Sequence, residues 1–232
     1  MGELLAAALR PWEAFPAWAA APRPLGPALG RMLRWRVPLA WAEALLGWWT
    51  LDVTLRRLPD LLGPSLQSLA RERGVDPADL RGVLMEFSAL PSYGKVWPWL
   101  LLSAPLLLLG TWLHHAVWDH GCLWMLGGLK SGKGFRASLE AEAEALTVAS
   151  VGSALGLLGL LPAVGLLLSL PLALVNLWFW GLRGFALAAR HGCPAWKGVA
   201  ATGLHLFLVS CCGAVFLWLL AATLLGSLAG GP

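Results

Sequence analysis

The feature that most constrains this chain is an uncharged stretch of thirty-eight residues from Ala145 to Leu182. As a single helix it would extend about 57 Å at 1.5 Å per residue, nearly twice the roughly 30 Å of bilayer hydrocarbon. The stretch must therefore turn back on itself, and Pro162-Ala163-Val164-Gly165 supplies turn-forming residues near its middle. We predict two adjacent membrane passes, 145–161 and 166–182, joined by that turn.

Composition extends this conclusion to the whole chain. The 232 residues are 58% hydrophobic and 13% charged, whereas an average globular domain has about 25% charged residues. So few charges cannot cover the surface of a soluble fold, which excludes an ordinary soluble enzyme and a nucleic-acid-binding module. The net charge of +4 is therefore interpreted as the basic residues that orient membrane helices.

Three more apolar stretches predict further passes at 37–55, 96–119 and 199–224. The predicted fold class is an all-α, polytopic integral membrane protein: a five-helix transmembrane bundle with interfacial amphipathic helices. A cytoplasmic, interfacial segment of residues 1–36 is expected to precede a transmembrane domain of residues 37–232.

A loop of residues 60–92 interrupts the predicted bundle. Within it, Asp76-Pro77 favours a helix start, and apolar residues then recur at helical spacing on one face. This pattern predicts an amphipathic helix on the membrane surface. The alternative is a small helical hairpin packed in water.

The positions of lysine and arginine predict the orientation of the passes, because cytoplasmic loops are enriched in both. The N-terminal segment and the loops after the second and fourth passes are basic, whereas the turn at 162–165 carries no basic residue. The loop 56–95 is the exception, with six basic residues offset by five acids. We predict a cytoplasmic N-terminus and an external C-terminus. The absence of isoleucine and a single asparagine indicate a GC-rich genome, hence a bacterial cytoplasmic membrane.

Ionisable side chains in and beside the passes form a candidate polar intramembrane cluster. Its members are His114, His115, Asp119, His120, Glu140, Glu144 and His205. His115 and Asp119 are four residues apart, as two metal ligands on one helix face would be. The sequence fixes no third ligand and lacks an HExxH motif, so we predict no metal site and no cofactor. Two interpretations stay open: polar residues that sit at headgroup level or hydrogen-bond within the bundle, or a proton or cation relay.

Two features flank the third pass. Glu140, Glu142 and Glu144 precede it and are predicted to occupy a first helical turn, where carboxylates are favourable. Within the pass, Gly152 and Gly156 form a GxxxG step, which lets helices approach closely, either within the chain or between copies.

The glycine-rich segment from Gly127 to Gly134 resembles a phosphate-binding loop, but Gly134 stands where the Walker pattern needs Ser or Thr after Lys133. We interpret the segment as a glycine cap that ends the second pass, followed by a basic cytoplasmic turn. The residues predicted to contact lipid or a protein partner are Lys130, Lys133, Arg136, Arg183, Arg190 and Lys197.

Several short motifs resemble the bacterial branch of the Yip-domain family, relatives of Rab-GTPase-interacting membrane proteins. They are His120 seven residues before Gly127-Gly128, Lys133-Gly134-Phe135, Leu161-Pro162-Ala163-Val164-Gly165, His191-Gly192 with Lys197, and the N-terminal RPWEAF and PRPLGPALGRMLRW. The resemblance touches most of the chain, but Lys130 and Ser131 are inserted into the glycine turn. It implies a five-pass helical bundle with a cytosolic N-terminus and no established catalytic residues.

The sequence therefore favours a non-enzymatic scaffold or membrane-organising protein of the Yip type. Its expected partners are membrane lipids and either a protein partner or further copies of the chain, with no nucleic acid. The first alternative is a transporter or channel for a small solute, proton or metal ion. The second is a membrane-embedded, metal-dependent enzyme.

Overall fold

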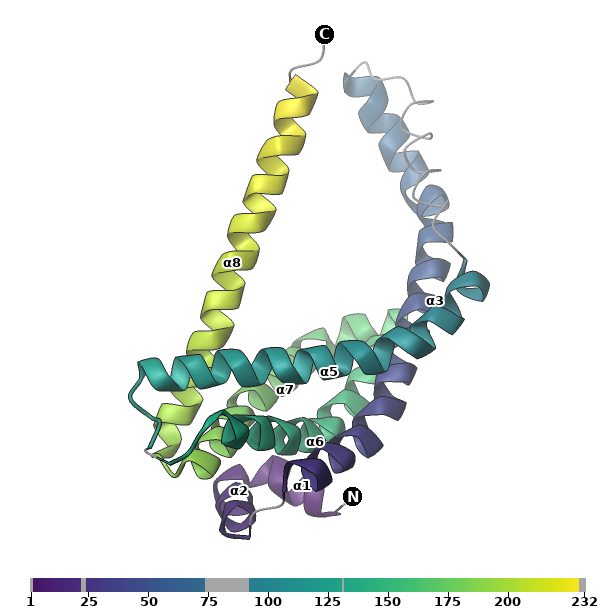
Figure 1. Ribbon diagram of the computed structural model, residues 1–232. Coiled ribbons are helices and arrows are strands. Elements are labelled where there is room, and N and C mark those ends of the chain that lie inside the picture. The colour runs from purple at the N-terminus through teal and green to yellow at the C-terminus, as the bar shows by residue number, and fades with distance from the viewer. Residues whose placement is uncertain (1, 22–23, 74–91, 131, 230–232) are drawn as a thin grey trace. The chain divides into compact units, whose positions relative to one another are not determined.

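The computed structural model describes residues 2–21, 24–73, 92–130 and 132–229 (Figure 1). Its helices are α1 (Gly2–Leu9), α2 (Pro11–Ala20), α3 (Leu25–Arg73), α5 (Tyr93–Met125), α6 (Phe135–Gly159), α7 (Pro162–His191) and α8 (Ala195–Ala229). Within these ranges the secondary structure is helical and contains no strand. The prediction of an all-α chain is confirmed.

Four helices are long and apolar enough to cross a membrane: Tyr93–Met125, Phe135–Gly159, Val164–His191 and Ala195–Thr223. They overlap the passes predicted at 96–119, 145–161, 166–182 and 199–224. The apolar side chains of three of them face mostly outward, with Leu166 80% and Leu167 81% exposed, whereas more than half of the apolar stretch of Phe135–Gly159 is buried. Soluble monomers rarely expose contiguous apolar surface of this kind. These faces are therefore suited to contact with lipid.

The predicted first pass, 37–55, lies inside the 49-residue helix α3. This stretch contains Glu43 and Asp52, and α3 is not among the four candidate spans of the described residues. The five-pass count therefore stays a prediction. Helix α3 continues to Arg73, so the first part of the predicted loop 60–92 is helical. The amphipathic helix expected after Asp76 falls on residues 74–91, outside the described part of the chain.

The predicted α6–α7 reversal is confirmed. Helix α6 ends at Gly159 and α7 begins at Pro162, so the turn lies just before the predicted tetrapeptide. Pro162 occupies the first helical position, where a missing N–H costs nothing. A Cβ on Gly165 would lie 2.1 Å from the carbonyl oxygen of Gly159. Only glycine fits there, because the two helix ends nearly touch.

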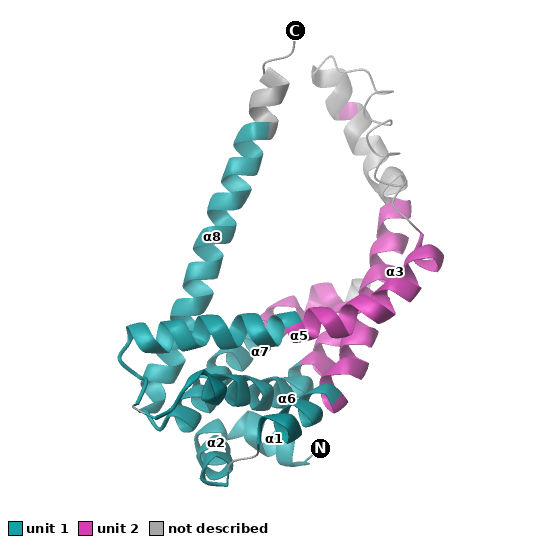
Figure 2. Ribbon diagram, viewed as in Figure 1, with its two compact units in different colours: residues 1–33, 110–152, 174–232 teal, residues 34–109, 153–173 magenta. Residues whose placement is uncertain are grey.

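The chain divides into two compact units (Figure 2). Unit 1 comprises residues 1–33, 110–152 and 174–232, and unit 2 comprises residues 34–109 and 153–173. In unit 2, the Trp41 indole donates to the carbonyl of Leu101 at 2.8 Å, and Thr50 donates to that of Leu160 at 2.9 Å. These bonds tie α3 to α5 and to the α6–α7 turn.

Two acidic residues of α3 lie in unit 2, and each has a basic partner. Asp52 pairs with Arg56 one turn later at 3.0 Å, and Glu43 lies 3.8 Å from Arg36. Arg36 also donates to Ser153 on α6. The two acids thus have separate partners, as their opposite helical faces require.

Unit 1 is built around the first part of α6, whose core-facing positions are mostly small. Ala141, Ala143, Ala145 and Val148 are buried. On the neighbouring helix, Phe179 fills the space beside Gly152, where an added Cβ would lie 2.3 Å from its ring. The first glycine of the GxxxG step thus packs within the chain.

Helices α7 and α8 cross at a point where each contributes a glycine, Gly184 and Gly198. A Cβ on Gly184 would lie 2.4 Å from Cα of Val199, and one on Gly198 would lie 2.1 Å from the carbonyl oxygen of Gly184. The backbones are therefore in direct contact. This approach brings the following turns of α8 against α7.

The N-terminal helices also belong to unit 1. Leu4 and Phe15 are buried, whereas Leu9 and Trp12 are exposed. The Trp178 indole on α7 donates to the carbonyl of Ala8 at 2.8 Å. Helices α1 and α2 thus pack on the bundle through one face.

Candidate functional site

A buried ion-pair group, the Arg183 cluster, joins four helices in unit 1. Arg183 on α7 donates to Asp119 on α5 at 2.7 Å, and its Nε lies 3.0 Å from Glu142 on α6. His205 on α8 lies 2.6 Å from Asp119 through Nδ1, and His115 lies 2.9 Å from Glu142 through Nδ1. These five residues define the cluster.

Aromatic rings enclose one side of the Arg183 cluster. The Trp118 ring stacks on the His205 ring, with centroids 5.8 Å apart and an interplanar angle of 10°. The Trp180 ring meets His205 edge-on at 5.3 Å and lies 4.2 Å from the Arg183 guanidinium. A cation over a tryptophan face is attracted by the ring quadrupole. The rings also lower the local dielectric around the ion pairs.

Burial makes the partners in this cluster interdependent. Asp119, Glu142, Arg183 and His205 are each at most 4% exposed. Removing one member of a buried ion pair costs about 3–5 kcal/mol, because the remaining charge is uncompensated. Within the described residues, two buried atoms of the cluster, Arg183 Nη1 and His205 Nε2, have no hydrogen-bond partner.

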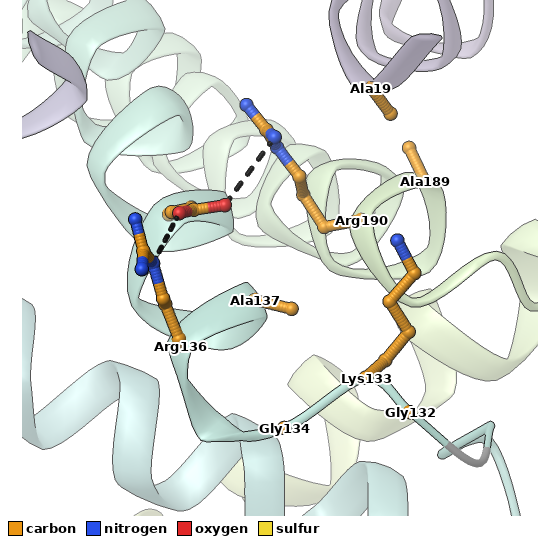
Figure 3. Close-up of a pocket in the computed structure, with 9 residues that line it drawn as sticks. Ala19, Gly132, Lys133, Gly134, Arg136, Ala137, Ala189 and Arg190 are labelled. Carbon is orange, nitrogen blue, oxygen red and sulfur yellow. Dashed lines mark hydrogen bonds and ion pairs between the residues drawn. The ribbon is translucent and has the colours of Figure 1, made fainter. Parts of the chain in front are cut away.

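A second group, the Arg190 cluster, lies two turns further along α7. Arg190 forms a bidentate pair with Glu144 through Nε, at 3.0 Å, and Nη2. Its Nη1 lies 3.5 Å from Glu140, which also accepts from Arg136 at 3.0 Å. These four residues define the cluster. It borders a cavity of about 310 Å³ (Figure 3).

A short hydrogen-bond chain completes the buried polar residues. His120 Nδ1 lies 2.9 Å from Ser138 Oγ, which in turn lies 2.8 Å from His191 Nε2. Ser138 and His191 are buried. The chain links α5, α6 and α7 without a charged member from Asp, Glu, Lys or Arg.

The predicted polar cluster is therefore brought together in three parts. His115, Asp119 and His205 belong to the Arg183 cluster, Glu140 and Glu144 to the Arg190 cluster, and His120 to the serine-linked chain. His114 is exposed at the edge, with its ring 5.4 Å from that of His205.

Two sequence interpretations need correction. Arg183 and Arg190 were expected to contact lipid, but they are 4% and 5% exposed, because α7 continues to His191 and pairs both with acids of α6. The three glutamates were expected in a first helical turn. Helix α6 begins earlier, at Phe135, and has no acid in its first turn.

Sequence reasoning missed Glu142, Arg183, Arg190, Ser138 and His191 as members of a buried network. One signal was present. In an antiparallel hairpin, residues at similar distances from the turn are neighbours; Glu142 lies 18 residues before Leu160, and Arg183 lies 22 residues after Leu161. Opposite charges at matched positions of two apolar arms indicate an ion pair.

The other predicted lipid-contacting residues lie at the turns of the bundle and form a basic rim, defined as Lys130, Lys133, Arg136 and Lys197. The first three are exposed. Lys197 donates to the carbonyl of Gly127 at 2.8 Å, which ties the α7–α8 turn to the α5–α6 turn.

The glycine cap predicted at the start of the α5–α6 turn is confirmed. Gly127 has a φ of 62°, and the N–H groups of Gly127 and Gly128 donate to the carbonyls of Trp124 and Leu123, each at 2.9 Å. This is the Schellman arrangement, which satisfies the last carbonyls of α5.

Among the described residues, no group of three or more His, Cys, Asp and Glu side chains is arranged to hold a metal ion. The carboxylates of both clusters instead face arginines.

Fold and site together define an all-helical protein with four helices able to cross a membrane and a buried ion-pair network among them. No family model, curated protein or solved structure matches the chain.

Proposed function

We propose that this chain is a non-enzymatic integral membrane protein of the Yip type, a scaffold that organises membrane through contacts with anionic lipid headgroups or a protein partner. Its N-terminus is cytoplasmic, and the membrane is the bacterial cytoplasmic membrane. Yip-type here rests on the sequence resemblance described above.

The basic rim is the observation that carries this proposal. Lys130 and Lys133 are exposed in the turn between two helices that are candidate membrane spans, and Arg136 is exposed in the first turn of the second. The exposed Trp124 and Trp196 lie at the adjoining helix ends, and tryptophan is enriched at headgroup level. Each basic residue near an anionic surface contributes about 1 kcal/mol of attraction.

The buried charges support a scaffold rather than an enzyme. In both arginine clusters carboxylates are held by guanidinium groups of α7. A nucleophile or general base needs room for a substrate beside it. Asp119, Glu142 and Glu144 do not line the cavity beside Arg190 and instead hold helices of the bundle together.

Charge reversal of the rim tests the proposal. Lys130→Glu, Lys133→Glu and Arg136→Glu are combined in the full chain, and lipids retained by the purified protein are counted by native mass spectrometry. We expect fewer bound phosphatidylglycerol molecules and an unchanged number of phosphatidylcholine molecules. The matched control, Lys130→Arg with Lys133→Arg and Arg136→Lys, keeps the charge and should keep the lipid. Equal retention by the reversed and control variants would refute the proposal.

A second candidate is transport of a proton, cation or small solute. The convergence of His115, Asp119 and His205, together with the unpartnered Nε2 of His205, favours it. Its test is uptake into proteoliposomes that contain a pH-sensitive dye. A conducting protein should lose uptake in Asp119→Asn and retain it in the exposed variant Lys95→Gln. Equal dye signals from protein-containing and empty liposomes would exclude this candidate for protons.

A further inference from the structure

The cavity beside the Arg190 cluster is formed by three helix ends. Its walls come from the turn before α6 and the first turns of α6, from the end of α7, and from Ala19 on α2. Lys133, Arg136, Glu140 and Arg190 supply its charged groups. Figure 3 shows Lys133 extending across the opening toward Ala189. All of these residues belong to unit 1.

The cavity lies at headgroup level if the candidate spans cross the membrane. One of these spans begins at Phe135 and another ends at His191. The cavity is lined by residues 132–134 just before the first span, by Arg136 and Ala137 at its beginning, and by Ala189 and Arg190 at the end of the second. A ligand here would therefore meet the polar boundary of the bilayer rather than its hydrocarbon.

The basic groups of the cavity differ in what they can still bind. Arg190 is held by Glu144 and Glu140 and forms a fixed wall. Arg136 uses Nε for Glu140, which leaves the N–H groups of both terminal nitrogens, and its side chain is 69% exposed. Among the described residues, Lys133 forms no side-chain hydrogen bond or ion pair. Lys133 and Arg136 therefore supply the free donors.

The charges also indicate the class of ligand. Lys133, Arg136 and Arg190 contribute three positive charges, and Glu140 and Glu144 contribute two negative charges, which leaves one positive charge. One phosphodiester carries a single negative charge and balances it. An ammonium group in the same head would lie beside the Lys133 ammonium and the Arg136 guanidinium and be repelled.

We infer that this cavity binds the phosphate of an anionic membrane lipid whose head carries no ammonium group. The inference rests on the proposed function, since it assigns one specific site within the general attraction of the basic rim. Its volume of about 310 Å³ lies at the lower end of small-ligand pockets, about 300–1,000 Å³. The alanines at 19, 137 and 189 leave this space open.

The test compares two lysines of the same rim. Lys133→Gln removes a cavity donor, whereas Lys130→Gln removes the same charge from the rim outside the cavity. For the full chain in detergent, the apparent Kd for short-chain phosphatidylglycerol is taken from the rise in thermal unfolding midpoint. We expect about tenfold weaker binding for Lys133→Gln, which corresponds to about 1.4 kcal/mol, and less than about twofold for Lys130→Gln.

Two other ligands separate the possible sources of the phosphate. Short-chain phosphatidylcholine should bind at least about tenfold more weakly than phosphatidylglycerol, and inorganic phosphate should give no comparable protection. Equal protection by phosphatidylcholine would overturn the headgroup assignment, and equal protection by inorganic phosphate would overturn the lipid.

Equal weakening by the two lysine variants would overturn the cavity while the general role of the rim stands. Failure of the rim itself is reported separately, by the triple charge reversal. Unfolding midpoints without lipid confirm that each variant is folded.

Discussion

Arg183 and Arg190 lie seven residues apart on α7, within about 20° of two full helical turns, and both pair with glutamates of α6. Their surroundings differ. Arg183 also contacts Asp119 on α5, and the ring of Trp180 lies against it. Arg190 borders a cavity beside the exposed Arg136. The same pairing thus serves as an internal cross-link at one level and as the wall of an accessible site at the other.

The comparison indicates how a membrane bundle can keep charges without exposing them to lipid. A charge inside the membrane is costly unless it is paired. At Arg183, the pairing involves three helices and histidine from a fourth. At Arg190, the acidic partners are Glu144 and Glu140, both on α6, and the cluster borders a cavity. The number of protein partners therefore falls toward the end of the bundle.

The largest expected effect comes from Arg183→Gln, which leaves Asp119 and Glu142 buried without a guanidinium. We expect a loss of about 3–5 kcal/mol in the free energy of unfolding, measured by denaturant titration in detergent. Arg190→Gln should cost less, because its acids lie beside the cavity and Arg136. Equal losses for the two variants would contradict the difference in surroundings between the Arg183 and Arg190 clusters.

Neutralising the acids should recover much of this loss. In the triple variant Arg183→Met, Asp119→Asn and Glu142→Gln, no uncompensated Asp, Glu or Arg charge remains in the cluster. Replacing a whole buried ion-pair group by residues of similar volume is often neutral or stabilising. We expect recovery of about half of the loss or more in the same titration. A triple variant as unstable as Arg183→Gln would mean that the arginine acts by its shape rather than its charge.

A smaller effect is expected at the helix crossing next to Arg183. Gly184→Ala places a Cβ 2.4 Å from the backbone of Val199, and overpacking of this kind costs about 1–3 kcal/mol. Gly181→Ala is the matched control, because nothing lies within 4 Å of its Cβ position. It should be neutral or slightly stabilising, since alanine is the better helix former. Circular dichroism melts compare the two, and similar midpoints would argue against the close crossing.

Rules for residues close in sequence predicted the helices and turns of this fold well. The partners of the buried charges, in contrast, are known only from the three-dimensional structure. The uncharged stretch and its proline predicted the α6–α7 reversal, and glycine chemistry predicted the cap at Gly127. Asp52 and Arg56 lie one turn apart on α3 and form the kind of pair that local spacing indicates. Arg183 was instead assigned to the basic loop after the fourth predicted pass, because it is the first charged residue after the uncharged stretch 145–182. Its partners lie 41 and 64 residues away, beyond the reach of any local pattern.

The smallest expected effect is a change in the rate at which a cysteine is labelled. This rate shows on which side of the membrane the Arg190 cluster lies. Cys193 lies in the α7–α8 turn, where partial burial raises the pKa of its thiol, so less reactive thiolate is present near neutral pH. Cys122 is buried, and Cys211 and Cys212 lie within a candidate span. A membrane-impermeant maleimide should therefore label Cys193 slowly and faster as the pH rises. Labelling should require access to the cytoplasmic face, and Cys193→Ser should abolish it. Labelling only from the outer face would place the Arg190 cluster and its cavity on the other side of the membrane and reverse the orientation proposed for the chain.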